Sequence, residues 1–136
     1  MYENQTKAEA RQWAWNRICD YFKPKYLRKQ TTVACLIGDT LNELELGIKK
    51  GFAIENIIGI DRRPEPVAMW KAAGGVAYQG EVLDVIKGLP NKPKAYILDF
   101  CNGINDSNIK TAFYCWGYSD LIIVNMLRGR DSINKY

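Results

Sequence analysis

The chain has 136 residues, a length typical of one domain, and its 47% hydrophobic and 25% charged residues are the composition of a globular protein. A disordered chain or a fibre is thereby excluded. No apolar run is close to the length of about 20 residues that is needed to span a bilayer. Residues 1–4 lack the charged segment followed by an apolar segment that is typical of a signal peptide. We therefore expect a cytoplasmic protein with no membrane contact.

The net charge of +4 is unevenly placed along the chain. Residues 1–30 hold seven basic residues against three acidic ones, whereas the remainder carries twelve of each. An excess of positive charge confined to one segment is typical of contact with an acidic partner. We expect residues 1–30, a basic helix and connector, to face a nucleic acid or an acidic protein surface. The side chains expected to make this contact are Arg11, Trp13, Arg17, Lys25, Arg28 and Lys29.

Residues 4–22 predict a helix, because apolar residues recur there at helical spacing. The members of this apolar stripe are Ala8, Ala14, Trp15, Ile18, Cys19 and Phe22. Arg11 lies at the edge of the stripe, whereas Trp13 points away from it. Pro24 ends the helix, and residues 23–30 form a basic connector.

From residue 31 onward, short apolar runs alternate with helical stretches. Strands are predicted at residues 33–37, 57–60, 76–78, 95–98 and 121–124. Helices are predicted at residues 41–50, 64–73, 82–87 and 104–116. Near-continuous apolar strands that alternate with helices are typical of a parallel sheet covered on both faces. The predicted fold is a three-layer α/β sandwich over residues 31–136, with a mostly parallel five-stranded sheet, helices on both faces and the N-terminal helix added.

The absence of histidine excludes Ser-His-Asp and Cys-His catalysis and the usual zinc sites that need imidazole. The four cysteines form no C-x-x-C pair, and they are Cys19, Cys35, Cys101 and Cys115. Three of them lie in apolar segments, which favours buried free thiols over a metal or disulfide role. No metal site is therefore predicted.

Acidic residues follow four of the predicted strands, and they are Asp39, Asp61, Glu81 and Asp99. Ligands of an open parallel sheet bind beyond the carboxyl ends of the strands, so these acids are candidate site residues. In nucleotide-binding sheets of this kind, an acidic residue at the end of the second strand binds the hydroxyls of the nucleoside. After Asp99, the sequence Phe100-Cys101-Asn102-Gly103 places an aromatic ring, a thiol and an amide near that carboxylate.

Structural explanations exist for the same residues. Thr40 and Glu43 fit a capping box, with Thr40 as the N-cap and Glu43 reaching back to it. Pairing with Arg62 or Arg63 would explain Asp61, and capping of the following helix would explain the acid after the fourth strand. The sequence is compatible with these three structural explanations as well as with ligand binding.

The order of these motifs over residues 31–125 resembles the class I S-adenosylmethionine-dependent methyltransferases. The motifs that carry the resemblance are VACLIGDTLN at 33–42, IGID at 58–61, YQGEVL at 78–83 and ILDF at 97–100. The resemblance implies that the first loop wraps the methionine part of the cofactor and that the fourth motif faces the methyl group and substrate. It also implies that Asp61 holds the ribose hydroxyls and that Glu81 approaches the adenine amino group.

A set of site residues follows from the resemblance. The cofactor-binding residues would be Gly38, Asp39, Thr40, Asp61, Arg62, Gly80, Glu81, Val82, Asp99 and Phe100. The catalytic residues would be Asp99 and Asn102, either of which would orient the methyl acceptor. Cys101 is less favoured as a nucleophile, because no base is recognisable nearby.

The first loop departs from the family pattern, because only Gly38 of the usual G-x-G-x-G is present and Thr40 and Asn42 take the other places. Leu36 stands where the family commonly has an acid. The family normally continues with two more strands after the fifth. The strand at residues 121–124 is therefore expected to be an apolar edge that pairs with another chain, in a homodimer or a complex with a different partner.

Three functions are compatible with these observations. The favoured one is a small methyltransferase-like protein that binds S-adenosylmethionine and transfers its methyl group, which requires alignment more than acid–base chemistry. The alternative is a degenerate, non-catalytic methyltransferase fold that acts as a binding or inhibitory module for nucleic acid or protein. A different nucleotide-binding domain, using NAD or a mononucleotide, is least favoured, because the loop matches neither G-x-G-x-x-G nor a phosphate loop.

Overall fold

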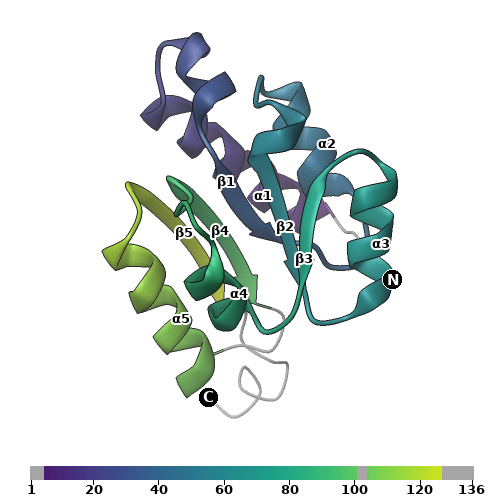
Figure 1. Ribbon diagram of the computed structural model, residues 1–136. Coiled ribbons are helices and arrows are strands. Elements are labelled where there is room, and N and C mark those ends of the chain that lie inside the picture. The colour runs from purple at the N-terminus through teal and green to yellow at the C-terminus, as the bar shows by residue number, and fades with distance from the viewer. Residues whose placement is uncertain (1–4, 101–103, 127–136) are drawn as a thin grey trace.

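The structure is a computed structural model that describes residues 5–100 and 104–126, and its centre is one five-stranded sheet (Figure 1). The strands are β1 (Val33–Leu36), β2 (Ile57–Asp61), β3 (Val76–Gln79), β4 (Ala95–Phe100) and β5 (Leu121–Met126). Their order in the sheet is β3-β2-β1-β4-β5, and all four neighbouring pairs are parallel. The predicted α/β class and the five-stranded sheet are therefore confirmed.

Helices cover both faces of this sheet (Figure 1). One face carries α1 (Gln5–Tyr21), α2 (Asn42–Lys49) and α3 (Pro64–Ala72), which share a buried apolar cluster with β1 and β2. The other face carries α4 (Val82–Gly88) and α5 (Asp106–Gly117), which share a second cluster with β4. Two short 3-10 helices, η1 (Lys25–Gln30) and η2 (Ile54–Asn56), lie in the connections. The result is the expected three-layer sandwich.

The N-terminal helix belongs to this core because its apolar stripe is buried on the sheet. Trp15 and Ile18 are fully buried, and Trp15 meets Phe52 edge-on with the ring centroids 5.3 Å apart. Gly47 of α2 lets this helix approach closely, since a Cβ there would come within 2.8 Å of both Trp15 and Ile57. The predicted extension of the stripe to Ala8 is wrong, because Ala8 is exposed.

Two helix starts differ from the sequence-based expectation. The N-cap of α2 is Leu41, and Thr40 Oγ1 only accepts a 3.2 Å hydrogen bond from the amide of Asn42. At α5, the N-cap is Asn105, whose side chain accepts a 2.8 Å hydrogen bond from the amide of Asn108. Capping by the acid of the fourth strand is therefore wrong, because this helix already has its own capping side chain.

Three of the four cysteines lie in the described part of the chain, and they are Cys19, Cys35 and Cys115. All three are buried free thiols, as expected. Burial raises the pKa of the Cys115 thiol to about 12 and raises that of Cys35 well above its ordinary value. Cys101 lies outside the described residues. Of the helices that the structure describes, none has the length and apolar character needed to cross a membrane.

Candidate functional site

The carboxyl ends of β1 and β2 are joined through the side chain of Asp61. This carboxylate accepts a 3.2 Å hydrogen bond from the amide of Gly38, at the end of β1. It also accepts hydrogen bonds from the backbone amide of Arg63 at 2.9 Å and from its guanidinium at 3.1 and 3.2 Å. The third guanidinium nitrogen donates to Asp39 at 2.8 Å. We call this arrangement, Asp39, Arg63 and Asp61, the Arg63 bridge.

The Arg63 bridge favours the ionised form of Asp61. Burial alone would raise the pKa of Asp61, but the hydrogen bonds from Arg63 and Gly38 and the charge of Arg63 together hold it below its ordinary value. Asp61 thus stays ionised to a lower pH than an ordinary aspartate. Of the two arginines considered from the sequence, Arg63 is the partner of Asp61, whereas Arg62 lies 3.8 Å from Glu81.

The exit of β3 contributes residues to the same edge of the sheet. Gly80 has a φ of 152°, a conformation that L side chains rarely adopt, and its amide donates a 3.0 Å hydrogen bond to the carbonyl of Asp61. Glu81 is exposed and is the N-cap residue of α4, which Val82 begins. The predicted cofactor-binding residues after β1, β2 and β3 are therefore gathered in one place by the sheet.

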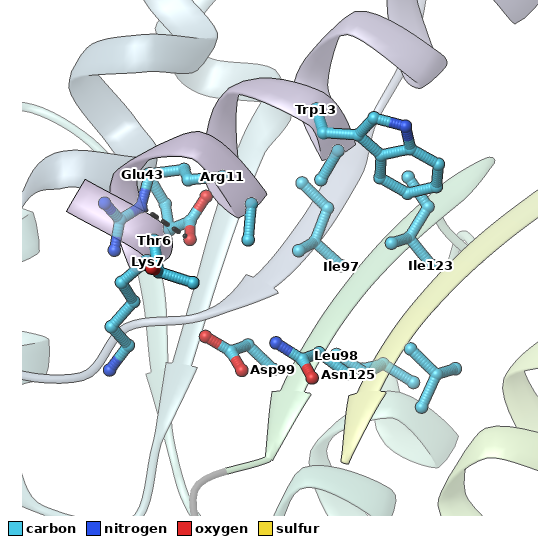
Figure 2. A pocket seen from close by; sticks show the side chains of 13 residues that line it. Thr6, Lys7, Arg11, Trp13, Glu43, Ile97, Leu98, Asp99, Ile123 and Asn125 are labelled. Carbon is cyan, nitrogen blue, oxygen red and sulfur yellow. Dashed lines mark hydrogen bonds and ion pairs between the residues drawn. The ribbon is translucent and has the colours of Figure 1, made fainter. Parts of the chain in front are cut away.

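A separate cavity of about 510 Å³ lies beside this edge, between α1 and the carboxyl ends of β4 and β5 (Figure 2). Ile97 and Ile123 form its apolar wall on the sheet, and Trp13 stands above them on α1. The polar residues that line it are Thr6, Lys7, Arg11, Glu43, Asp99 and Asn125. Asp99 and Asn125 are register partners on adjacent strands, so their side chains lie next to each other. An apolar cavity with a few convergent polar groups is typical of a small-molecule site.

Glu43 is the buried acid of this cavity, and the capping role expected for it is wrong. Its carboxylate accepts a 2.8 Å hydrogen bond from the Trp15 indole and a 3.0 Å hydrogen bond from Nε of Arg11. Burial raises the pKa of Glu43, the contacts with Trp15 and Arg11 oppose that rise, and the charge of Asp99 adds to it. The signal in the sequence was Arg11, a charged residue at the edge of a buried stripe that required an acidic partner.

Other expected site residues lie elsewhere. Phe100 is buried in the cluster on the face of α4 and α5, so its ring does not wall the cavity on the face of α1. Asp99 is the last residue but one of β4 rather than the residue that follows the strand. Asn102, expected to orient the acceptor, falls outside the described residues. Asn125 lines the cavity and was not among the predicted site residues. Its signal was an amide on the same strand face as Ile123.

The expected partner-contact residues have mixed surroundings. Trp13 and Lys29 are exposed, and Arg17 lies over the Trp13 ring at 5.8 Å from its centroid. Arg11 instead turns inward to Glu43, with its side chain 13% exposed. Arg28 is half-buried and donates to the carbonyl of Lys50 at 3.2 Å. The side chain of Lys25 lies outside what the structure describes. Over the described ranges, no three acidic or cysteine side chains gather closely enough to hold a metal ion.

Comparison with known proteins identifies the fold. Neither a protein-family model nor a curated protein matches the sequence. Among solved structures, the chain is similar to a SAM-dependent methyltransferase from Archaeoglobus fulgidus, with a TM-score of 0.51 and 18% identity over 84% of this chain and 52% of that one. It is also similar to a methyltransferase from Geobacter sulfurreducens, with a TM-score of 0.42 and 18% identity over 85% and 68% of the two chains.

The protein therefore has a methyltransferase-like α/β fold, as the order of its motifs predicted. It spans about half the length of the Archaeoglobus fulgidus protein. At this level of identity the similarity defines the fold, and activity has to be argued from the site.

Proposed function

We propose that this protein binds S-adenosylmethionine across the carboxyl ends of β1, β2 and β4 and transfers its methyl group to an acceptor held in the cavity beside α1. The observation that carries the proposal is the cavity itself, because it lies next to Asp99 at the carboxyl ends of the strands in a methyltransferase-like fold. The acceptor would be small, since the cavity measures about 510 Å³.

The residues at the β1–β2 edge fit the cofactor. Gly38 has a φ of 74° and open space where a Cβ would stand, so the backbone can approach a ligand there. The ionised carboxylate of Asp61 lies beside it and suits two hydroxyl donors of a ribose. Glu81 at the exit of β3 would face the adenine amino group, and Asp39, Thr40, Arg62, Gly80 and Val82 would surround the nucleoside.

When bound, S-adenosylmethionine supplies an electrophilic methyl group on a sulfonium, and the chain's own residues have to align the acceptor with it. Trp13, Ile97 and Ile123 would exclude water from the acceptor. Asp99 and Asn125 would orient the attacking atom by hydrogen bonds, and Asp99 would accept the proton that an N–H or O–H acceptor releases. Glu43 would hold α1 over the cavity through Trp15 and Arg11.

Calorimetric titration tests the cofactor site. Asp61→Ala is expected to weaken the binding of S-adenosylmethionine and S-adenosylhomocysteine by about 1.5–3 kcal/mol, the value of hydrogen bonds to a charged group. Glu55→Ala, which removes an exposed acid in η2, is the control and should bind like the wild type. Unchanged affinity in Asp61→Ala would contradict the assignment.

A second candidate function is a non-catalytic binding module, and the observation that favours it is the Arg63 bridge, which already engages the ribose-binding carboxylate. The exposed Trp13–Arg17 pair on the basic segment would then face a nucleic acid or an acidic protein. Absence of any cofactor binding in the titration would favour this module. Its binding to nucleic acid should weaken by roughly 0.7–0.9 log units per neutralised phosphate for each log of salt.

We also propose that the β5 side of the molecule pairs with another chain. In the sheet formed by the described residues, β5 is an edge strand whose first four residues are apolar, without the lysine or proline that protects edges. On α5, Phe113 and Trp116 stack with their ring centroids 6.0 Å apart, and they are 64% and 66% exposed. Ile109, one turn earlier, extends this stripe and is also exposed. Apolar surface of this kind marks an interaction site.

Light scattering tests this pairing. The wild type is expected to show a mass above the 15.5 kDa of one chain, either as a homodimer or as a complex that is purified with a bound partner. Trp116→Lys should lower the association by about tenfold or more, because it places a charge in the apolar contact. Tyr26→Lys changes an equally exposed aromatic residue, 64% exposed, on η1 and should leave the mass unchanged. A sharp monomer across dilution, with no partner recovered, would contradict the proposal.

A further inference from the structure

The carboxylate of Asp61 has no acceptor position left for a ligand while the Arg63 bridge is closed. Its Oδ1 accepts from the amide of Arg63 at 2.9 Å and from Nε at 3.1 Å. Its Oδ2 accepts from the amide of Gly38 at 3.2 Å and from Nη2 of Arg63 at 3.2 Å. A carboxylate offers about four lone-pair sites, and all are occupied here. A ribose that donates two hydroxyls must therefore displace two of these donors.

The two donors that can leave are those of the Arg63 side chain. The amides of Gly38 and Arg63 are fixed by the backbone, whereas the guanidinium lies at the surface. The side chain of Arg63 is 51% exposed and that of Asp39, its other partner, is 77% exposed, while that of Asp61 is 12% exposed. The guanidinium thus covers a nearly buried carboxylate from the solvent side. It can turn into water without disturbing the apolar core.

We propose that Arg63 competes with the ribose for Asp61, so that the Arg63 bridge is a closed state that nucleoside binding must open. The inference rests on the proposed cofactor site and adds its regulation. The exchange is balanced, because two hydrogen bonds from the guanidinium are replaced by two from the ribose hydroxyls. An ion pair whose guanidinium is half-exposed favours its closed geometry by about fivefold, and the apparent affinity for the nucleoside falls by a similar factor.

The sign of this effect distinguishes competition from ordinary ligand contact. If Arg63 competes, its removal tightens binding, whereas removal of a residue that touches the ligand weakens it. Salt gives a second readout with adenosine, which carries no charge of its own. High salt screens the pairs of Arg63 with Asp39 and Asp61, so the wild type should bind adenosine more tightly as salt rises.

The experiment is a calorimetric titration of S-adenosylhomocysteine, with adenosine followed by NMR at low and high salt. Arg63→Ala is expected to bind both probes about fivefold more tightly than the wild type and to lose the salt dependence. The control is Lys71→Ala, which removes an exposed positive charge from the last turn of α3, the helix whose N-cap residue is Arg63. Its affinity for both probes should match that of the wild type. The carboxyl resonance of Asp61, titrated without ligand, should show a higher pKa in Arg63→Ala, because the bridge holds it low.

Each other outcome overturns the proposal in a recognisable way. Equal affinity of Arg63→Ala and the wild type would mean that the bridge does not compete, and the cofactor site would stand. Weaker binding by Arg63→Ala would make Arg63 a ligand contact. No binding of either probe by any folded variant would remove the nucleoside site itself, and the proposed function with it. Circular dichroism confirms that each variant is folded before it is titrated.

Discussion

Replacement of Glu43 by alanine is expected to lower the free energy of unfolding by about 3–5 kcal/mol, the typical effect of removing one partner from a buried ion pair. The variant leaves the Trp15 indole N–H buried without its acceptor at 2.8 Å. It also removes the carboxylate that pairs at 3.0 Å with Nε of Arg11, whose side chain is 13% exposed. A buried charge that loses its partner costs far more than an exposed one.

Urea unfolding followed by tryptophan fluorescence measures this loss. Glu45→Ala, two residues further on the exposed side of α2, is the matched control and should change stability by no more than about 0.5 kcal/mol. The double variant Arg11→Met with Glu43→Gln removes both charges and should recover most of the loss, because the gain from pairing in such sites roughly balances desolvation. A small effect of Glu43→Ala would mean that α1 is held by its apolar stripe alone.

The same carboxylate gives a pH dependence with a defined sign. Burial raises the folded-state pKa of Glu43 above its ordinary value of 4.5. The native state therefore binds this proton more tightly than the unfolded state does, and the resulting stability is lost as pH rises through the folded-state pKa. Compared with Glu43→Gln, which cannot titrate, the wild type should lose unfolding free energy as the pH rises above the ordinary glutamate pKa of 4.5. Parallel curves for the two proteins would contradict the raised pKa.

The strands were predictable because buried parallel strands are near-continuous apolar runs, and each run ends in a polar residue or a glycine. The end of β4 was not predictable in this way. Asp99 and Phe100 extend this strand because they pair in register with Asn125 and Met126 of β5. Such pairing joins segments far apart in the chain and leaves no local signal. The cavity residue Asn125 was missed for the same reason.

Glu43 shows why the candidate site was only partly predictable. Its spacing from Thr40 satisfies the capping pattern, which is a local rule, but its partners Trp15 and Arg11 lie about 30 residues earlier in the chain. The acids at the strand exits were easier to find, because the carboxyl ends of parallel strands meet at one edge. Which arginine would hold Asp61 depended on side-chain geometry that the sequence does not contain.

The last prediction concerns Asp99, whose replacement by asparagine is expected to lower the rate of methyl transfer by about 100-fold or more while stability changes little. The physical reason is that asparagine keeps the shape of the side chain but removes the negative charge. Without that charge, the side chain cannot take the proton that the methyl acceptor releases. The cap of α5 is Asn105, so folding of that helix does not depend on Asp99.

Transfer of radiolabelled methyl from S-adenosylmethionine to fractionated small molecules and macromolecules measures the rate, and urea unfolding measures stability. Asp120→Asn changes an exposed acid just before β5 and is the matched control, with transfer at the wild-type rate. Asn125→Asp places a second negative charge beside Asp99 and should shift the rate profile to higher pH, because two adjacent carboxylates raise one another's pKa. Transfer by Asp99→Asn at the wild-type rate would show that Asp99 has no catalytic part, and the acceptor would then be aligned by the cavity walls and Asn125.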